Sequence, residues 1–409
     1  MFVTHLEGAL DGERLPHDRV QTMSGGRPLW VRYDLAAVGH AVKRDDLAQR
    51  PADLWRYREL LPVEDPANIV SLGEGWSPLL DCPQLARELA LDRLWIKDES
   101  QLPTGSFKSR GLAMAVSRAR ELGIKRLAIP TAGNAGGALA AYAARAGLEA
   151  WVFMPADTPV VNRIEASLFG ARAYLVDGLI SDCGAVVRAG ADAMGWFDCS
   201  TLKEPYRLEG KKTMGLELAE QLGWRLPDAI LYPTGGGTGL IGMWKAFAEL
   251  RELGWLEDSK LPRLYSCQSD GCAPIAQAYA AGERFAEPVA DAHTVASGLR
   301  VPGAVGDFMI LDAVRDSHGA ALAAPESELI NWTRRAAAAE GISFCPETAA
   351  CLAVLDRLVE EGSIRSDEEV VVFNTGAAQK YVEALSADLP CLPPIDRIDW
   401  DLMASDAVT

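Results

Sequence analysis

Strand-like and helix-like segments alternate along most of this chain, and this alternation is the feature that most constrains its fold. Short apolar runs are each followed by a polar loop and then by a longer segment with helical periodicity. The expected strands cover residues 93–96, 127–130, 150–154, 229–232 and 370–373, and the helices after them cover 110–122, 135–147, 160–170, 239–253 and 377–385. Such alternation is typical of parallel sheets covered by helices. The sequence therefore predicts an α/β fold of the doubly wound kind.

The charge balance narrows the class of ligand that the chain can bind. Its 409 residues include 40 Lys and Arg against 57 Asp and Glu, which gives a net charge of −17. Such a chain repels nucleic acid and anionic membrane surfaces. An anionic ligand must therefore be held by local backbone N–H groups or by a few well-placed cations.

Targeting and metal-binding signals are missing from the sequence. The N-terminus has no basic segment followed by a long apolar one, and no stretch reaches the roughly 18 apolar residues of a membrane span. The eight cysteines form no C-x-x-C pair, and none of the five histidines stands at ligand spacing from a cysteine. We therefore expect a cytoplasmic protein with reduced cysteines, no metal, and no nucleic-acid or membrane partner.

The two ends of the chain lie outside the alternating pattern. Residues 1–70 mix short apolar runs with proline and charge, and we expect an N-terminal arm that wraps the body rather than a separate core. Residues 388–409 carry three prolines and several aspartates, which predicts an extended or loosely docked tail.

The loops that follow the strands are the ones to examine, because ligands of open α/β sheets bind beyond the carboxyl ends of strands. In the first, Gly105 permits a tight turn, Ser106 is a good N-cap, and Lys108 falls in the first helical turn. There the helix dipole and the nearby Arg110 should lower the pKa of Lys108 towards the neutral amine that forms a Schiff base. The alternative is an ordinary solvated lysine.

Two further loops offer backbone N–H groups to a ligand. The small residues of 130–137 form either a carboxylate site or a tight turn chosen for packing. In 233–242, consecutive glycines open a helix and predict a phosphate cradle.

The same glycines also fit a dinucleotide-binding fingerprint, in the register Gly237-x-Gly239-x-x-Gly242. The next expected strand ends in Gln268 rather than an acid, however, and Asp270 lies 28 residues past Gly242 rather than about 20. A nicotinamide-dependent oxidoreductase is therefore the less favoured interpretation.

Thr375 follows the last expected strand, where its hydroxyl either bonds a neutral ring nitrogen or caps a helix. An amine, an amide, a phosphate cradle and a hydroxyl at one sheet edge are the groups that pyridoxal phosphate uses. A hydroxyl does not protonate the pyridine nitrogen strongly, which suits elimination and replacement at the β and γ carbons better than transamination. The sequence thus favours pyridoxal phosphate as cofactor.

Five motifs together resemble the threonine synthase family, within the tryptophan-synthase-β-like group (fold type II) of pyridoxal phosphate enzymes. The resemblance runs from about Ser71 to Leu385. Its carriers are LGEGWSPL at 72–79, GSFK at 105–108, TAGN at 131–134, RLEGKKT at 207–213 and GGGTG at 235–239.

This resemblance implies two open, mostly parallel, doubly wound sheets in two domains. Residues 1–105 would form the N-terminal arm and the first part of the large domain. Residues 106–228 would form a small domain that closes over the large one. Residues 229–387, with the phosphate loop, would complete the large domain, and 388–409 would be the tail. The family also leads us to expect a homodimer.

The resemblance also implies a role for each site residue. Lys108 would form the Schiff base and shuttle protons, with Phe107 beside it, and Asn134 would bond the cofactor's phenolic oxygen. Thr375 would face the pyridine nitrogen. The cofactor phosphate would be bound by Gly235, Gly236, Gly237, Thr238 and Gly239, and the substrate by Ser77, Thr131, Ala132, Gly133 and Arg207.

The activity implied is that of a carbon–oxygen lyase that converts O-phospho-homoserine and water to threonine and phosphate. A serine/threonine ammonia-lyase, or another β-eliminating or β-replacing enzyme of the same fold, is the alternative. A phosphorylated substrate needs a second anion site, for which the candidates are Arg110, Arg207, Lys203 and Lys211.

The chain departs from the family's pattern at three places. Ser109 stands where the family usually has Asp, and the stretch before Arg207 lacks the Asn-Ser pair often found there. Glu347 replaces a small residue near the site, either as a proton-transfer acid or as a carboxylate at a helix start.

Overall fold

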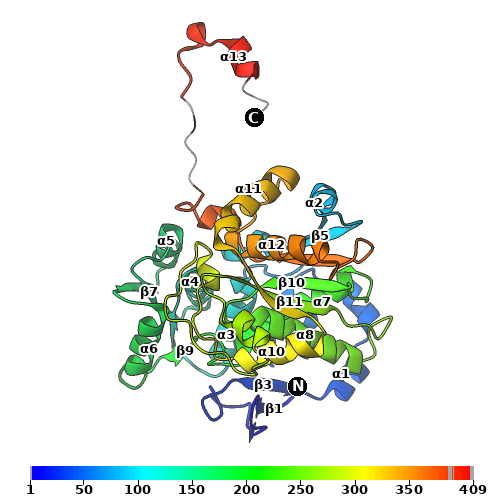
Figure 1. Ribbon diagram of the computed structural model, residues 1–409. Helices are drawn as coiled ribbons and strands as arrows, with labels where there is room; N and C mark the ends of the chain where they lie inside the picture. The colour runs from blue at the N-terminus through cyan, green and yellow to red at the C-terminus, as the bar shows by residue number, and fades with distance from the viewer. Residues whose placement is uncertain (1, 386–388, 390, 406–409) are drawn as a thin grey trace.

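The structure is a computed structural model that describes residues 2–385, 389 and 391–405. Within this part of the chain, strands and helices alternate from β5 to β13, except that α9 is followed by α10 and α11 by α12 (Figure 1). The strands are β1 (Val3–Gly8), β2 (Arg14–Leu15), β3 (Leu29–Tyr33), β4 (Leu79–Asp81), β5 (Leu94–Asp98), β6 (Arg126–Pro130), β7 (Glu149–Pro155), β8 (Arg172–Val176), β9 (Phe197–Asp198), β10 (Ala229–Pro233), β11 (Arg263–Ser269), β12 (Ala320–Ala324) and β13 (Val370–Asn374). The helices are α1 (Leu35–Ala41), α2 (Pro83–Glu88), α3 (Lys108–Glu121), α4 (Asn134–Ala146), α5 (Val160–Leu168), α6 (Ile180–Met194), α7 (Tyr206–Gln221), α8 (Thr238–Glu252), α9 (Pro274–Ala280), α10 (Asp307–Asp316), α11 (Leu329–Glu340), α12 (Pro346–Glu360) and α13 (Trp400–Ser405).

A six-stranded sheet in the order β12-β11-β10-β13-β5-β4 forms the centre of the larger half. Its strand pairs are parallel except β4 with β5. Successive side chains point to opposite faces: Ile230 and Tyr232 pack with α7, α8 and α10, whereas Ala229 and Leu231 pack with α11 and α12. The sheet is therefore buried on both faces, as expected for a doubly wound fold.

A four-stranded sheet in the order β8-β7-β6-β9 forms the second layered unit, and all its strand pairs are parallel. Val152 and Met154 of β7 face α3 and α4, while Trp151 and Phe153 face α6. The predicted fold class, with two open and mostly parallel sheets, is confirmed. The domain boundaries drawn from the sequence stay a prediction.

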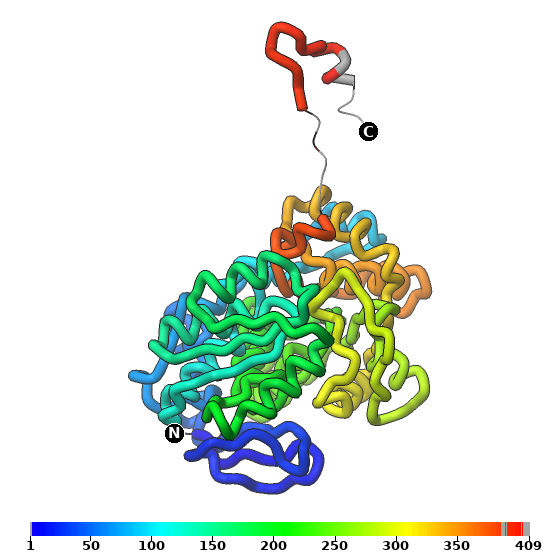
Figure 2. The backbone as a smooth tube through the Cα atoms, turned by 90° about the vertical axis from the view of Figure 1, so that its left-hand side faces the viewer, coloured from blue at the N-terminus to red at the C-terminus, as the bar shows by residue number. Residues whose placement is uncertain are grey.

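The first part of the N-terminal region, up to Tyr33, differs from the expected arm, whereas later residues such as Val38 and Leu54 pack into the main apolar clusters of the body. Its strands form a three-stranded antiparallel sheet in the order β2-β1-β3, which lies at one end of the molecule (Figure 2). This sheet buries a small apolar cluster of its own, made of Val3, Leu6, Leu29 and Val31. The strands are short and irregularly spaced, so their pairing is not evident from local periodicity.

The prediction of a helix at 377–385 is wrong. The structure has a single 3-10 turn at Ala378–Lys380 instead. Two contacts with distant elements fix the backbone here: Lys380 pairs with Glu165 of α5, and Tyr381 donates a hydrogen bond to Glu347 of α12. Tertiary contacts of this kind override local helical preference.

The C-terminal tail follows the last strand of the body. In the described part of the tail, a 3-10 turn at Ile395–Arg397 and helix α13 stand apart from the body, in line with a loosely docked segment (Figures 1 and 2). Residues 386–388, 390 and 406–409 lie outside the described residues.

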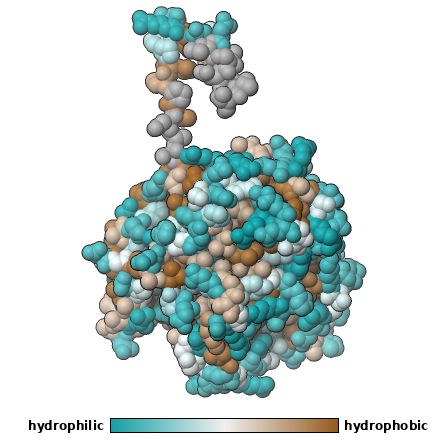
Figure 3. All heavy atoms as spheres, viewed as in Figure 1, coloured by the Kyte–Doolittle hydropathy of each residue, from teal (hydrophilic) through white to brown (hydrophobic). Residues whose placement is uncertain are grey.

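The face shown in Figure 3 is mostly hydrophilic. Among the described residues, no helix is long and apolar enough to cross a membrane.

A fully buried cluster of charges joins the start of α3 to β5 and α7. The guanidinium of Arg110 donates to both oxygens of Glu99, at 2.6 and 2.8 Å, and to both oxygens of Glu217, each at 2.9 Å. Lys97 of β5 forms a second ion pair with Glu217. The two cations outweigh the effect of burial on Glu217 and lower the pKa of its carboxyl to about 2. The two carboxylates and the two basic side chains therefore compensate one another through direct contacts.

Removing Arg110 from this cluster should destabilise the fold strongly. The substitution Arg110→Met leaves two buried carboxylates with only Lys97 as a counter-charge, and we expect the free energy of unfolding to fall by about 3–5 kcal/mol in urea titrations. The matched control is Arg365→Met, which removes an exposed arginine paired with Asp367 and should leave the titration unchanged. Equal losses in the two variants would contradict the importance of the cluster.

Candidate active site

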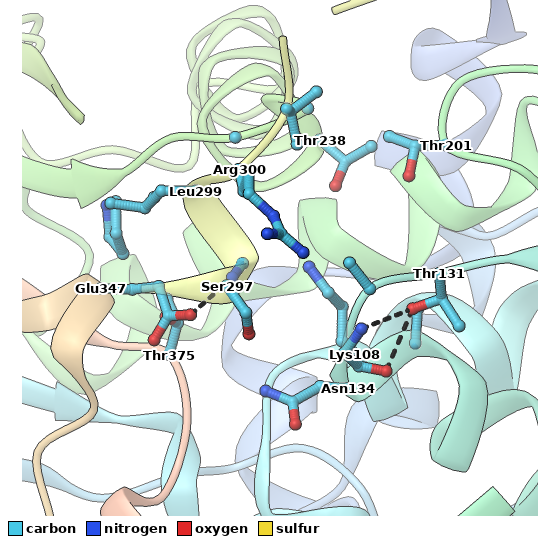
Figure 4. A pocket seen from close by; sticks show the side chains of 18 of the residues that line it. Lys108, Thr131, Asn134, Thr201, Thr238, Ser297, Leu299, Arg300, Glu347 and Thr375 are labelled. Atoms are coloured by element: carbon cyan, nitrogen blue, oxygen red, sulfur yellow. Dashed lines mark hydrogen bonds between the residues drawn. The ribbon is translucent and has the colours of Figure 1, made fainter. Parts of the chain in front are cut away.

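A pocket lies at the carboxyl ends of β6, β10 and β13, and loops from both large sheets line it (Figure 4). This is the position at which open α/β sheets bind ligands. Nearly all the site residues expected from the sequence line it: Phe107, Lys108, Thr131, Ala132, Gly133, Asn134, Arg207, Gly235, Gly236, Gly237, Thr238, Gly239 and Thr375.

Lys108 is the first residue of α3 and points into the pocket (Figure 4). The loop before it is fixed to the loop of Thr375, because the N–H of Phe107 donates to the Thr375 carbonyl at 3.0 Å. The Lys108 amine lies 4.0 Å from the centre of the Phe107 ring. Among the described residues, no carboxylate forms an ion pair with Lys108, so its amine is available to a ligand.

The environment of Lys108 favours the neutral amine. Burial lowers the pKa of Lys108 to about 7, and the positive charge of Arg207 acts in the same direction. The direction agrees with the sequence-based expectation, but the source of the repelling charge does not. The charge of Arg110 is compensated by Glu99 and Glu217. The cation that lowers the pKa of Lys108 is instead Arg207, which is distant in the sequence.

The loop between β6 and α4 carries Asn134 at the start of the helix. The hydroxyl of Thr131 accepts the N–H of Gly133 at 3.1 Å and donates to the carbonyl of the same residue at 3.0 Å, which holds the loop in shape (Figure 4). Asn134 donates to the hydroxyl of Tyr381 at 3.5 Å, while its buried side-chain oxygen has no partner. Thr131 therefore shapes the loop, and the Asn134 amide faces the ligand space.

The glycine loop between β10 and α8 forms the opposite wall. Gly237 has φ = +79°, which a residue with a side chain adopts only with strain. A Cβ at Gly235 or Gly239 would collide with the Gly298 carbonyl or the Tyr232 hydroxyl. Among the described residues, nothing accepts a hydrogen bond from the N–H groups of 235–239. These groups, at the N-terminus of α8, are a suitable site for a phosphate.

Thr375 lies in the pocket wall beside Glu347 (Figure 4). Its hydroxyl is 3.7 Å from the Cys345 thiol, and its N–H donates to the hydroxyl of Thr348 at 3.3 Å. Buried at the end of β13, this hydroxyl can bond a ring nitrogen, as the sequence suggested.

Arg207 is the one of the four cations considered for a second anion site that lines the pocket. It is 2% exposed, it donates to the Cys199 carbonyl at 2.6 Å, and its buried Nε has no partner. The other three point elsewhere. Arg110 belongs to the buried charge cluster, Lys203 pairs with Asp198, and Lys211 donates to the carbonyl of Phe107.

Ser77 does not reach the pocket, which corrects its expected role in substrate binding. Its hydroxyl donates to Glu99 at 2.6 Å, and its N–H donates to Glu217 at 2.7 Å. Ser77 is thus part of the buried cluster around Arg110. The motif at 72–79 stabilises the base of α3 rather than contacting the ligand.

Several residues that line the pocket were not identified from the sequence, namely Ile180, Tyr232, Ser297, Gly298, Leu299, Arg300, Val301 and Tyr381. Five of them belong to the stretch 297–301, within the long connection between α9 and α10. A long connection with little regular structure is often functional, and this was the available signal. Arg300 of this stretch forms a bidentate ion pair with Asp157, at 2.7 and 2.9 Å.

Comparison with known proteins identifies the family. The model of the family "Pyridoxal-phosphate dependent enzyme" matches residues 70–376. The threonine synthase of Methanocaldococcus jannaschii is 34% identical over 366 residues, which cover 89% of this chain and 90% of that protein. The threonine synthase of Methanosarcina acetivorans is 35% identical over 347 residues, 85% of this chain and 84% of that protein.

Solved structures agree on the fold. The processed form of threonine deaminase isoform 2 from Solanum lycopersicum matches with a TM-score of 0.64 and 19% identity, over 85% of this chain and 95% of that one. At this identity the likeness concerns the fold alone.

The residues of the pocket fit the cofactor of the family. Pyridoxal phosphate requires an amine, an anion site and partners for its ring, and the pocket presents the Lys108 amine, the N–H groups of 235–239, the Asn134 amide and the Thr375 hydroxyl. Among the described residues, no group of three or more His, Cys, Asp or Glu is placed to hold a metal ion. The chain therefore belongs to the pyridoxal-phosphate dependent enzyme family, as a lyase related to the threonine synthases.

Proposed function

We propose that this enzyme converts O-phospho-homoserine and water into threonine and phosphate. The observation that carries this proposal is the position of Arg207, whose buried guanidinium lines the pocket together with the glycine loop and forms no ion pair among the described residues. A pocket with two anion sites suits a phosphorylated cofactor together with a phosphorylated substrate. The names of the relatives at 34% and 35% identity support the same reaction.

In this proposal each wall of the pocket has its own task. The N–H groups of 235–239 hold the cofactor phosphate, Thr375 bonds the pyridine nitrogen, and Asn134 bonds the phenolic oxygen. The loop 131–133 receives the carboxylate of the substrate, and Arg207 receives its phosphate. When bound, the cofactor stabilises negative charge on the carbon next to the amino group of the substrate.

Lys108 does the acid–base work of the proposed reaction. A pKa of about 7 leaves a large fraction of its amine neutral at physiological pH. The Nζ atom of Lys108 would hold the cofactor when it is present, and the same atom would take up and return the proton at the α carbon of the substrate. The nearby charge of Arg207 keeps this amine from holding its proton too tightly.

An ammonia-lyase acting on serine or threonine is the second candidate, and one observation favours it. The segment before Arg207 contributes only Thr201 to the pocket, because Ser200 and Lys203 both interact with Asp198. A phosphate would then have few donors besides Arg207. Such a pocket also suits a smaller substrate without a phosphate.

Phosphate release separates the two candidates. We expect purified holoenzyme to release phosphate from O-phospho-homoserine and to form threonine, whereas Lys108→Ala should do neither. Arg207→Met should lower kcat/KM by about 10²- to 10³-fold, because it removes a charge-assisted contact. Lys203→Met, which removes a cation outside the pocket, is the control and should retain most activity. Keto acid formed from threonine or serine, without phosphate release, would favour the ammonia-lyase.

The pH dependence of cofactor attachment tests the environment of Lys108. Only the neutral amine reacts, so the rate at which the apoenzyme takes up pyridoxal phosphate should rise with pH, with a midpoint near 7. The measurement is the growth of absorbance that borohydride reduces. Arg207→Met removes a repelling charge, makes the Lys108 ammonium more stable, and should move the midpoint upward. A wild-type midpoint near the ordinary lysine value of 10.5 would refute this account.

A further inference from the structure

Glu347 is a carboxylate in a pocket otherwise built for anions. It lies in the first turn of α12 and is 4% exposed. Of the described residues that line the pocket, it is the one with an acidic side chain. Figure 4 shows it beside Thr375, on the wall opposite Thr131 with Lys108 between them.

The two oxygens of Glu347 have different surroundings. Oε1 accepts the N–H of Gly298 at 2.7 Å and the hydroxyl of Tyr381 at 2.6 Å. Oε2 is buried and has no hydrogen-bond partner. A buried carboxylate oxygen without a partner costs free energy, unless a ligand supplies the missing donor or a positive charge. The arrangement therefore fixes Oε1 and leaves Oε2 as a buried carboxylate oxygen in the pocket wall, close to the Cys345 thiol.

Gly298 is required for this arrangement. A Cβ at residue 298 would lie 2.7 Å from Oε1 of Glu347, so a larger residue would push the carboxylate away. Tyr381 keeps its proton, because burial and then the charge of Glu347 raise its pKa well above the usual value. The phenol thus remains a donor to Oε1 and does not compete for Oε2.

Tyr381 also links Glu347 to Asn134, the residue that we assign to the phenolic oxygen of the cofactor. The Asn134 amide donates to the Tyr381 hydroxyl at 3.5 Å, so the Tyr381 hydroxyl connects Asn134 to Glu347. The titratable and charged groups around Glu347 on the neighbouring elements are Lys108 of α3, Arg207 of α7, Cys345 before α12, Arg300 and Tyr381. Arg300 is already paired with Asp157, and Glu204 is the carboxylate that acts most strongly on Arg207, whereas Glu347 is the carboxylate whose charge acts on Lys108.

We propose that Glu347 is a positioning residue whose negative charge holds the proton on the nitrogen that links Lys108 to the cofactor. The inference rests on the roles proposed above for Lys108 and Asn134. A carboxylate within about 4–6 Å of a cationic nitrogen favours its protonated form, and this form is the more reactive towards an incoming amino group. Glu347 acts only through its negative charge and takes no part in bond breaking.

The test is a pH titration of the visible absorption band of the holoenzyme, without substrate. The band reports whether the linking nitrogen carries its proton. Glu347→Gln keeps the shape of the side chain and removes its charge, so the midpoint of the titration should fall by about one pH unit or more. Glu347→Asp keeps the carboxylate but shortens the side chain by one methylene group, which moves the charge away from the linking nitrogen. The midpoint should therefore fall by less than in Glu347→Gln.

The matched control is Glu149→Gln. This substitution makes the same chemical change at an exposed residue that pairs with Arg126 and does not line the pocket, and it should leave the midpoint unchanged. If Glu347→Gln does not fold or bind the cofactor, the Glu347→Asp titration decides alone. A wild-type midpoint in either Glu347 variant, or an equal shift in Glu149→Gln, overturns the proposal. Because no substrate is present, a failure to release phosphate from O-phospho-homoserine would leave this result intact.

Discussion

The compensation of buried charge around Arg110 is the constraint on which the active site depends. Two carboxylates and two cations removed from water are tolerated only when their partners are fixed in place, and here the partners come from β5, α3 and α7. The backbone of Ser77 is fixed by the same cluster. Because Arg110 is two residues after Lys108, the cluster sets where the lysine emerges. Glu99 and Glu217 are committed to Arg110 and Lys97 rather than to Lys108.

The pocket reverses the charge of the molecule around it. The chain carries a net charge of −17, yet the pocket wall presents Lys108 and Arg207 without carboxylate partners among the residues that the structure describes. Burial and mutual repulsion between these cations work together, and this is why the amine loses its proton readily. Glu347 is placed across the pocket from this cationic side. One side of the pocket is therefore basic and the other acidic, a difference that the overall composition does not show.

Local sequence patterns were enough for much of the site and for the architecture. A strand followed by a helix leaves a loop at a known edge of the sheet, so Asn134, Thr375 and the glycine loop could be assigned from the sequence. Side-chain partners could not, because they depend on contacts between distant segments. Ser77 and Arg110 belong to one buried cluster that no periodicity reveals. Tyr381 enters the pocket because the chain after Thr375 turns rather than forming the expected helix.

The glycine loop has one more consequence, which concerns the division of labour in the pocket. In the proposed arrangement the cofactor phosphate is anchored by backbone N–H groups, and these do not titrate in the physiological range. Lys108, by contrast, changes its charge near neutral pH. The anchor is therefore insensitive to the same pH change that switches the reactive amine. Attachment and reactivity are chemically independent, so the enzyme can retain its cofactor through each interval in which the covalent bond to the lysine is broken.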